Sequence, residues 1–138
     1  MNATITKFGY PATLIRDYVH WVLLLRPAQV TAGSLILAAK GDATAYGDLP
    51  KAALVEQAVI IPDVEKILRS SIKTDKFNYL MLMMVDPHVH FHIFPRYQGD
   101  RSLAGLVLTD HGWPGPPDLK SAIELDSTAL GLAIEALR

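Results

Sequence analysis

Apolar residues along the chain gather in runs of strand length that are separated by turn residues. Trp21–Leu25 is rich in strand formers and ends at Arg26-Pro27, which predicts a buried strand. After the turn residues of 28–33, a second apolar run spans Ser34–Ala39 and stops at Lys40. The two runs predict an antiparallel hairpin.

A long helix is predicted after this hairpin, because apolar residues then recur at helical spacing. Asp48 is a candidate N-cap, and Pro50 suits the first turn, where a missing N–H costs little. Pro62 removes a backbone donor inside the helix and predicts either a kink or a division into two helices. The stripe expected to face the core consists of Leu54, Ala58, Ile61, Val64, Leu68 and Ile72.

The second half of the chain continues with strand-like runs and closes on a helix. Phe77–Val85 is an apolar run that only Asp86-Pro87 separates from the next strand, so we expect two adjacent antiparallel strands. Leu103–Leu108 predicts one further short strand. Asp126 is a candidate cap for a C-terminal helix. That helix carries its apolar side chains on one side, namely Leu130, Ala133, Ile134 and Leu137.

Three of the five histidines sit two residues apart in the strand that follows Asp86-Pro87. Successive side chains on a strand point to opposite faces, so His88, His90 and His92 are predicted to share one face. The residues between them are apolar and take the other face. One face of this strand is therefore expected to carry chemistry and the other to join the core.

The spacing of these histidines limits what they can do together. Neighbouring histidines on a strand lie roughly 6.6 Å apart and the outer two roughly 13 Å apart. A single metal ion can be shared by two of them, but by all three only if the strand bends strongly. Evenly spaced imidazoles suit an extended polyanion, with one ring acting on a phosphate and its neighbours orienting it. His20 and His111 lie outside the row, and for them we expect structural or surface roles.

Composition narrows the class of protein. With 138 residues, half of them hydrophobic, the chain is long enough for one domain with a sizeable core. Its net charge of −1 gives no argument for binding nucleic acid or an anionic membrane surface. It has no cysteine, no apolar run of membrane-spanning length and no secretion signal at its N-terminus. We therefore expect a cytoplasmic protein.

The segment His88-Val89-His90-Phe91-His92-Ile93-Phe94 matches His-φ-His-φ-His-φ-φ, with φ apolar, and in this the chain resembles the histidine triad family. The resemblance covers roughly residues 18–117. It includes the first hairpin, the helix and the strand before the triad, and Trp113-Pro114-Gly115-Pro116 is similar to a segment of one bacterial branch. It implies an α+β fold with about five antiparallel strands, one main packed helix and a C-terminal helix. A single domain over 1–138 is expected, with 1–17 as a lead and 118–138 as a helical extension.

The resemblance also implies an activity. Members of the diadenosine polyphosphate hydrolase type act on purine nucleoside phosphate derivatives through a nucleotidyl-histidine intermediate. His90 would be the nucleophile, and His88 and His92 would orient it, contact phosphate oxygens and help to protonate the leaving group. The family usually forms homodimers, and the triad itself requires no metal or other cofactor.

Five further residues are predicted to bind substrate by this resemblance, namely Ser34, Asn78, Asp86, Arg96 and Trp113. Three of them have structural alternatives. Asp86 can orient His88 or only form the turn, Arg96 can contact phosphate, a partner subunit or a surface carboxylate, and Trp113 can close over a nucleotide or pin a loop.

Two departures from the family pattern keep other functions open. Many members have a fourth histidine where Ser34 follows Gly33, and the Gly-Asn of the nearest branch is replaced by Met83-Met84. Losing one donor to the transition state can cost ~10²- to 10³-fold in rate. A non-catalytic nucleotide-binding module is therefore an alternative, as is a metal-dependent hydrolase using two triad histidines and Asp86.

Overall fold

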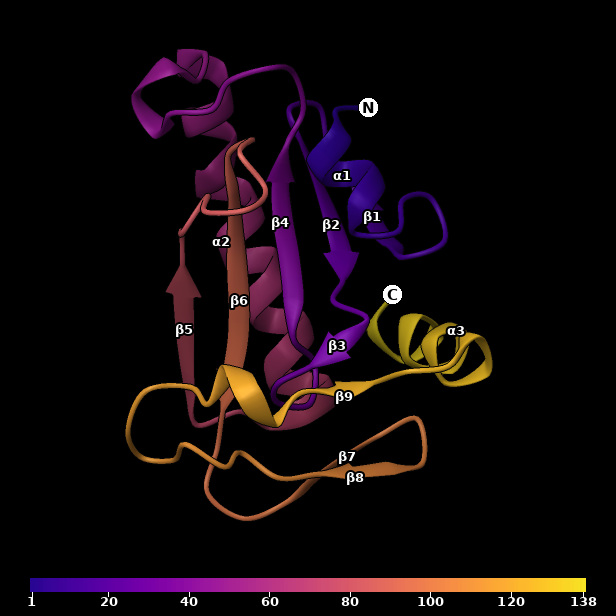
Figure 1. Ribbon diagram of the computed structural model, residues 1–138. Coiled ribbons are helices and arrows are strands. Elements are labelled where there is room, and N and C mark those ends of the chain that lie inside the picture. The colour runs from indigo at the N-terminus through magenta and orange to yellow at the C-terminus, as the bar shows by residue number, and fades with distance from the viewer.

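The computed structural model describes all 138 residues, which fold around a five-stranded antiparallel sheet with the strand order β1-β2-β4-β6-β5 (Figure 1). The strands of the sheet are β1 (Leu14–Asp17), β2 (Trp21–Leu25), β4 (Leu35–Ala39), β5 (Lys76–Leu80) and β6 (His90–Arg96). The helices are α1 (Ala3–Lys7), α2 (Lys51–Ile72) and α3 (Ser127–Leu137), with short 3₁₀ turns η1 (Tyr46–Asp48) and η2 (Leu119–Ser121). The predicted α+β class is confirmed.

The predicted hairpin is confirmed as β2 and β4. The strands pair in continuous register from Trp21 opposite Ala39 to Leu25 opposite Leu35. All ten positions are buried, because both faces of the sheet are covered at this point. The connection between the strands holds one unpredicted element, β3 (Ala28–Gln29), which pairs with β9 (Ile123–Glu124) near the C-terminus.

Helix α2 packs against one face of the sheet, but its buried stripe differs from the predicted one in the first half. The side chains that it buries are those of Ala53, Ile60, Val64, Leu68 and Ile72. Leu54 and Ala58 are exposed, so their assignment to the core was wrong.

The start of α2 also departs from the prediction. Pro50 precedes the helix without a side-chain cap, and Asp48 belongs to η1, so the proposed Asp48 cap was wrong. The helix runs through Pro62 to Ile72 without a division. Pro62 and Ala58 are both exposed, so the Ala58 carbonyl that loses its helical donor can bond water.

Strands β5 and β6 are adjacent and antiparallel as predicted, with Lys76 opposite Arg96 and Leu80 opposite His92. The prediction of a strand as far as Val85 was wrong, because pairing stops at Leu80. Residues 81–89 form a connection in which Met84 and Val85 are 81% and 80% exposed. The apolar run therefore extends past the strand into a surface loop beside the histidines.

The two faces of the sheet carry separate apolar clusters. The larger cluster has 22 buried residues and lies on the side of α2 and α3. The smaller one has 5, and it joins Ile5 of α1 to Val22, Leu24, Ile36 and Ala38 on the opposite face. In Figure 1, α2 lies behind the sheet, and the segment with η2 and β9 crosses in front of it. None of the three helices is long and apolar enough to cross a membrane.

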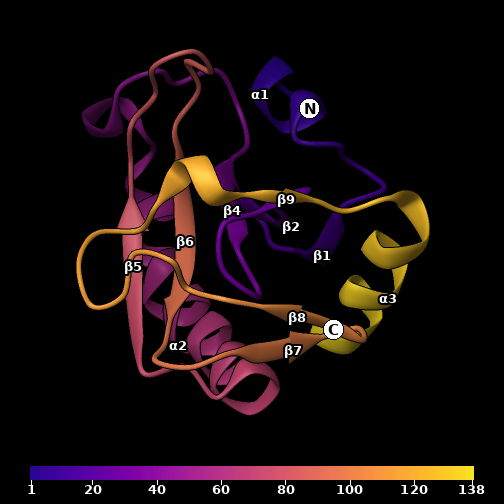
Figure 2. The same ribbon diagram turned by 60° about the horizontal axis from the view of Figure 1, so that its bottom comes forward.

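The segment after β6 forms a hairpin where one short strand was predicted. Strands β7 (Arg101–Leu103) and β8 (Leu106–Leu108) pair across a turn in which Ala104 and Gly105 have positive φ values of 52° and 82°. The hairpin extends from the end of β6 toward α3 (Figure 2). Helix α3 begins as predicted, with the Asp126 side chain accepting a hydrogen bond from the Ala129 N–H.

A buried ion pair ties this C-terminal segment to the sheet. The Arg96 guanidinium donates two hydrogen bonds to the carboxylate of Asp110, at 2.7 and 3.0 Å, and a third to the Gly115 carbonyl at 2.8 Å. Both side chains are almost fully buried, at 3% and 1% exposure. The pair therefore fixes the course of the chain from β8 to Gly115 across the end of β6.

We expect Asp110→Ala to lower the free energy of unfolding by about 3 to 5 kcal/mol, because it leaves the buried Arg96 charge without its carboxylate. Urea unfolding followed by circular dichroism measures this. Asp17→Ala is the matched control, since Asp17 pairs with Lys40 at the surface and is half exposed. Its cost is expected to be below about 1 kcal/mol. Equal costs for the two variants would contradict the structural role given to the buried pair.

Candidate active site at the histidine row

Two of the three histidines lie on β6 and face the side of the sheet that α1 covers. His90 pairs with Ala38 and His92 with Ile36, whose side chains belong to the smaller apolar cluster. Val89 and Ile93 are buried in the larger cluster on the α2 side. The predicted separation into a chemical face and a core face is therefore observed, except that His88 lies just before the strand and not on it.

His90 is held in one orientation by the backbone of the residue two positions before it. Its Nδ1 lies 2.7 Å from the carbonyl oxygen of His88. A carbonyl oxygen only accepts hydrogen bonds, so Nδ1 carries the proton and donates it. In the neutral ring the lone pair then lies on Nε2. His90 has the tautomer and the fixed ring position that a nucleophilic Nε2 requires.

His88 is bound by the Thr4 hydroxyl on α1. The His88 backbone N–H donates to Thr4 Oγ1 at 3.3 Å, and the His88 Nδ1 lies 2.9 Å from the same oxygen. When the hydroxyl donates its own proton to Nδ1, the Nε2 of His88 is the protonated nitrogen. The Thr4 hydroxyl thus holds the His88 ring through Nδ1, and the tautomer of the ring decides whether the hydroxyl donates this hydrogen bond or accepts it.

His92 is neutral at pH 7. Burial lowers its pKa to about 4, and the neighbouring His90 and Arg26 act in the same direction. Its Nδ1 is buried and has no hydrogen-bond partner. The ring lies 5.1 Å from that of His90 and stacks on Phe94 at 6.0 Å. His92 can thus offer one N–H or one lone pair to a ligand without carrying charge.

Helix α1 and Phe8, the residue after it, make three contacts with the histidine row and the turn before it, and the first is that of Thr4 with His88. The Phe8 ring lies 5.4 Å from that of His90 and 5.9 Å from that of His92. The Lys7 ammonium group lies 2.7 Å from the Asp86 carboxylate. His90 is consequently only 2% exposed. Sequence reasoning treated this segment as a lead, although the spacing of the apolar Ile5 and Phe8 could have indicated a packed turn.

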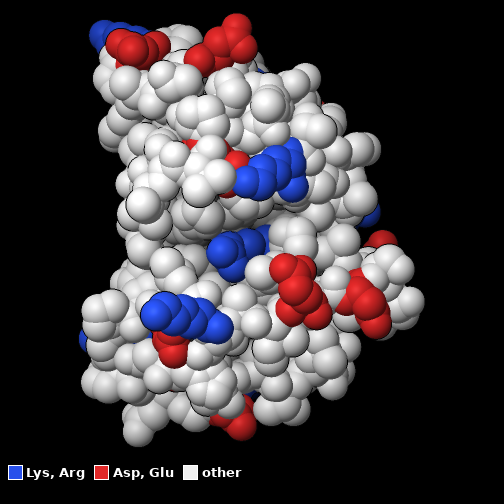
Figure 3. All heavy atoms as spheres, in the orientation of Figure 1, with Lys and Arg blue, Asp and Glu red and all other residues white.

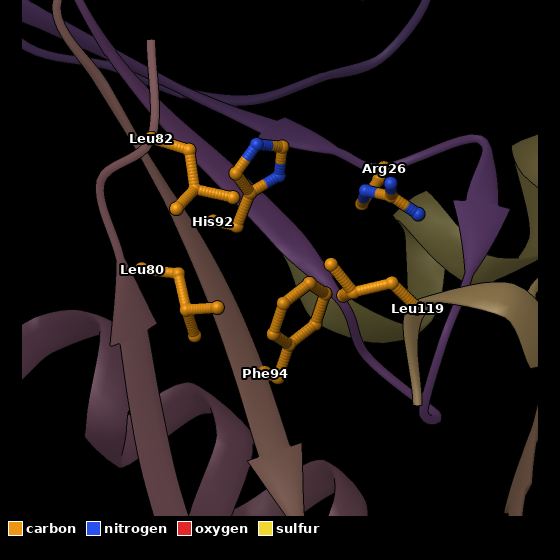
Figure 4. A pocket seen from close by; sticks show the side chains of 6 residues that line it. All are labelled: Arg26, Leu80, Leu82, His92, Phe94 and Leu119. Carbon is orange, nitrogen blue, oxygen red and sulfur yellow. The ribbon is translucent and has the colours of Figure 1, made fainter. Parts of the chain in front are cut away.

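A cavity of about 140 Å³ lies beside His92 on the same face (Figure 4). Leu80 and Leu82 line one side of it, and Phe94 lies along its floor. Arg26 and Leu119 line the other side. Arg26 is a functional candidate that the sequence pattern marked only as the residue at which the first strand ends. The available signal was a cation placed directly after a run of five apolar residues.

Ser34 and Asp86 lie near the histidine strand but have other partners. Ser34 is fully buried, and its hydroxyl donates to the Thr31 carbonyl at 2.7 Å and accepts from the Thr31 N–H at 3.0 Å. Asp86 is paired with Lys7. No group of three or more histidine, aspartate or glutamate side chains is arranged to hold a metal ion, so Asp86 does not form a ligand set with two triad histidines.

Asn78, Arg96 and Trp113 gather at the opposite end of β5 and β6. The Asn78 amide oxygen accepts a hydrogen bond from Arg96 Nη1 at 2.7 Å. The Lys76 ammonium group lies 5.4 Å from the centre of the Trp113 ring. These three residues are brought together around the buried ion pair and not around His90. Met83 and Met84 lie in the connection between the strands, with Met84 exposed.

By sequence, the chain matches no family model and no curated protein. Solved structures match it over nearly its whole length. A histidine triad protein from Bradyrhizobium japonicum is 22% identical, with 99% of this chain and 93% of that chain covered and a TM-score of 0.74. One from Sinorhizobium meliloti 1021 is 16% identical, with the same coverage of 99% and 93% and a TM-score of 0.76.

A third solved structure carries a more specific name. It is a hypothetical histidine triad nucleotide-binding protein from Sulfolobus tokodaii strain 7, which is 17% identical, with 97% of this chain and 86% of that chain covered and a TM-score of 0.70. At these identities the likeness establishes the architecture. The chain has the histidine triad fold, as its motif predicted.

The depressed pKa of His92 predicts a pH-dependent stability. The ordinary pKa is 6.5 and the folded value is about 4, so the unfolded chain takes up a proton at His92 before the folded protein does. The stabilisation is complete above about pH 6.5 and is lost as the pH falls toward 4. Urea unfolding at pH 7 and pH 4.5 is expected to show a smaller difference for His92→Gln than for the wild type. An unchanged difference would rule out this contribution.

Proposed function

We propose that the protein is a nucleotide hydrolase or nucleotidyl transferase that works through a nucleotidyl-histidine intermediate on His90. The observation that carries this proposal is the hydrogen bond from His90 Nδ1 to the His88 carbonyl at 2.7 Å, which leaves Nε2 as the nucleophilic atom. The sequence motif around the three histidines and the histidine triad fold of the solved neighbours support it.

The reaction would proceed in two displacements at one phosphorus. His90 Nε2 attacks the α-phosphorus, the N–P bond forms, and the bond from phosphorus to the leaving group breaks with its electron pair on that group. A His88 ring that carries both protons gives the Nε2 proton to the leaving group, and it stays bound through Nδ1 to the Thr4 hydroxyl oxygen 2.9 Å away. Water or another acceptor then gives its proton to His88 as it attacks the phosphorus, the N–P bond breaks with its electron pair on Nε2, and both His88 and His90 are restored.

His92 acts in this scheme as a neutral hydrogen-bonding group. Because burial holds its pKa near 4, it does not supply a charged proton donor at pH 7. A purine nucleoside phosphate derivative, such as a dinucleoside polyphosphate or a phosphoramidate, is the proposed substrate, on the strength of the family resemblance. The name of the Sulfolobus neighbour, which includes nucleotide binding, supports a nucleotide in this class.

A non-catalytic nucleotide-binding module is the alternative, and a specific observation favours it. The Ser34 hydroxyl, which replaces the fourth histidine of many family members, is fully occupied by Thr31. Leu80 and Leu82 line the cavity beside His92, so the side chains from this part of the chain are apolar and offer a phosphate no donors. Both features reduce the electrostatic stabilisation of a transition state.

A covalent adduct test decides between the two. Incubation with several adenylyl compounds, followed by mass spectrometry of the intact protein and its peptides, is expected to find a nucleotidyl group on His90. His90→Ala should lower adduct formation and turnover by at least about 10³-fold, since the nucleophile is lost. His111→Ala is the control, because His111 is exposed and outside the site.

The outcomes separate clearly. Turnover by His90→Ala at the wild-type rate would exclude His90 as nucleophile. Micromolar nucleotide binding by calorimetry, with neither adduct nor turnover for any compound tested, would establish the non-catalytic module instead.

The proposal includes a homodimer. Helix α2 exposes a row of apolar side chains on the face turned away from the sheet, with Val55 and Val59 61% and 69% exposed and Leu54 40% exposed. Exposed apolar side chains four residues apart on a helix form a continuous strip that a second copy can cover.

We expect sedimentation velocity to find a dimer for the wild type and a shift toward monomer for Val59→Glu, which places a charge in this strip. Val107→Glu is the matched control, because Val107 is 66% exposed on β8, away from α2. A monomeric wild type, or a Val59→Glu variant that stays dimeric, would contradict an interface on α2.

A further inference from the structure

Arg26 differs from four other arginines because it has no ion-pair partner. Arg16, Arg69, Arg96 and Arg101 each have a carboxylate within 4.0 Å. Arg26 has none. Its Nη1 donates to the Ala28 carbonyl, and its Nε is buried without a hydrogen-bond partner. The guanidinium group is thus held in place by one neutral acceptor and lacks a counter-ion.

The surroundings of Arg26 make that missing counter-ion costly. Burial lowers the pKa of the guanidinium group, and Glu124 acts weakly in the opposite direction from beyond ion-pair distance. An arginine stays protonated in proteins, so the positive charge persists in a partly desolvated position. The Phe94 ring, 5.8 Å from the guanidinium carbon, provides only a weak cation–π contact. An anion bound from outside would relieve this cost.

Two cavities meet at Arg26. One is the 140 Å³ cavity with His92, whose remaining lining is apolar. The other, of about 240 Å³, is lined by Lys7, Phe8 and Glu124 among others. Small-molecule pockets usually measure ~300 to 1,000 Å³, so the cavity at His92 has the size of one part of a ligand. Figure 3 shows lysine and arginine side chains along a hollow in the middle of this face.

The cavity at His92 contains a second unpartnered nitrogen. His92 Nδ1 and Arg26 Nε are both buried without hydrogen bonds, and both residues line the same space. Figure 4 shows the His92 ring and the Arg26 side chain at its upper edge, above Phe94, with the leucines at its sides. A ligand that fits must therefore present an anionic or accepting group at that edge and an apolar body below it.

We infer that Arg26 is an anion-binding residue and that the cavity at His92 takes a carboxylate or phosphate group carried on a short apolar chain. The apolar part packs between Leu80, Leu82 and Phe94, and the acid group pairs with the guanidinium. His92 lines this cavity and also belongs to the histidine row. That this acid is part of the substrate therefore rests on the proposed function. Its binding does not depend on His90.

Calorimetry on the full-length wild-type protein with acetate, butyrate, hexanoate, inorganic phosphate and butyl phosphate tests the inference. Affinity is expected to rise along the carboxylate series by about fourfold per methylene group, as burial of about 0.8 kcal/mol per CH₂ requires. The comparison of butyrate with butyl phosphate shows which head group the site prefers. Hexanol, which has no charge, is expected to bind at least about tenfold more weakly than hexanoate.

Arg26→Gln should weaken hexanoate and butyl phosphate binding by about 10- to 100-fold, since it removes a charged hydrogen-bond donor. Arg69→Gln is the matched control, because Arg69 lies exposed on α2 and is expected to leave binding unchanged. Equal binding of hexanol and hexanoate by the wild type would overturn the inference without any variant, as would an Arg26→Gln variant that is folded and binds like the wild type.

His90→Ala separates this inference from the proposed reaction. The variant should bind hexanoate as the wild type does while forming no nucleotidyl adduct. Organic acid binding without an adduct in the wild type would leave the Arg26 site standing and remove the proposed reaction. An adduct on His90 without organic acid binding would support the proposed reaction and remove the Arg26 site.

Discussion

The pairing of β6 between β4 and β5 is the constraint on which the rest of the structure depends. With Ala38 opposite His90 and Leu80 opposite His92, the histidine side chains can only face away from α2. A shift of one residue in this register would bury the imidazoles against the α2 core and expose Phe91 and Ile93. The large apolar cluster on the α2 side therefore fixes the orientation of the histidine face, although it contains none of the histidines.

That chemical face is completed by the N-terminal segment. Thr4, Lys7 and Phe8 reach the histidine row and the connection before it, although about eighty residues of sequence separate them. Thr4 of α1 binds His88, and Phe8, directly after the helix, covers His90, which is 2% exposed. One short segment of the chain thus both holds His88 and covers His90.

The two arginines at the ends of β2 and β6 show how similar side chains take different roles. Arg96 is fully paired with Asp110 and Asn78, and its bonds hold the C-terminal segment in place. Arg26 has a carbonyl as its only hydrogen-bond partner and faces a cavity with an uncharged histidine. The family resemblance made Arg96 a candidate for phosphate contact, beside a salt bridge or a contact with a partner subunit, whereas the pattern of satisfied and unsatisfied donors favours Arg26. The lack of an ion-pair partner, and not the positive charge alone, therefore distinguishes Arg26 as the candidate binding residue.

The sequence by itself determined the hairpin of β2 and β4, the long helix, the C-terminal cap at Asp126 and the alternation of the histidine strand, because these depend on local periodicity and capping chemistry. It misplaced Leu54 and Ala58, extended β5 to Val85, and treated residues 1–17 as a lead. Only the tertiary structure decided these points. Which residue of an apolar run is buried depends on what packs against it, and the partners of Arg26, Arg96 and His88 lie far away in the chain. Distant contacts of this kind leave no periodic signal, so the row of histidines could be recognised in the sequence while its surroundings could not.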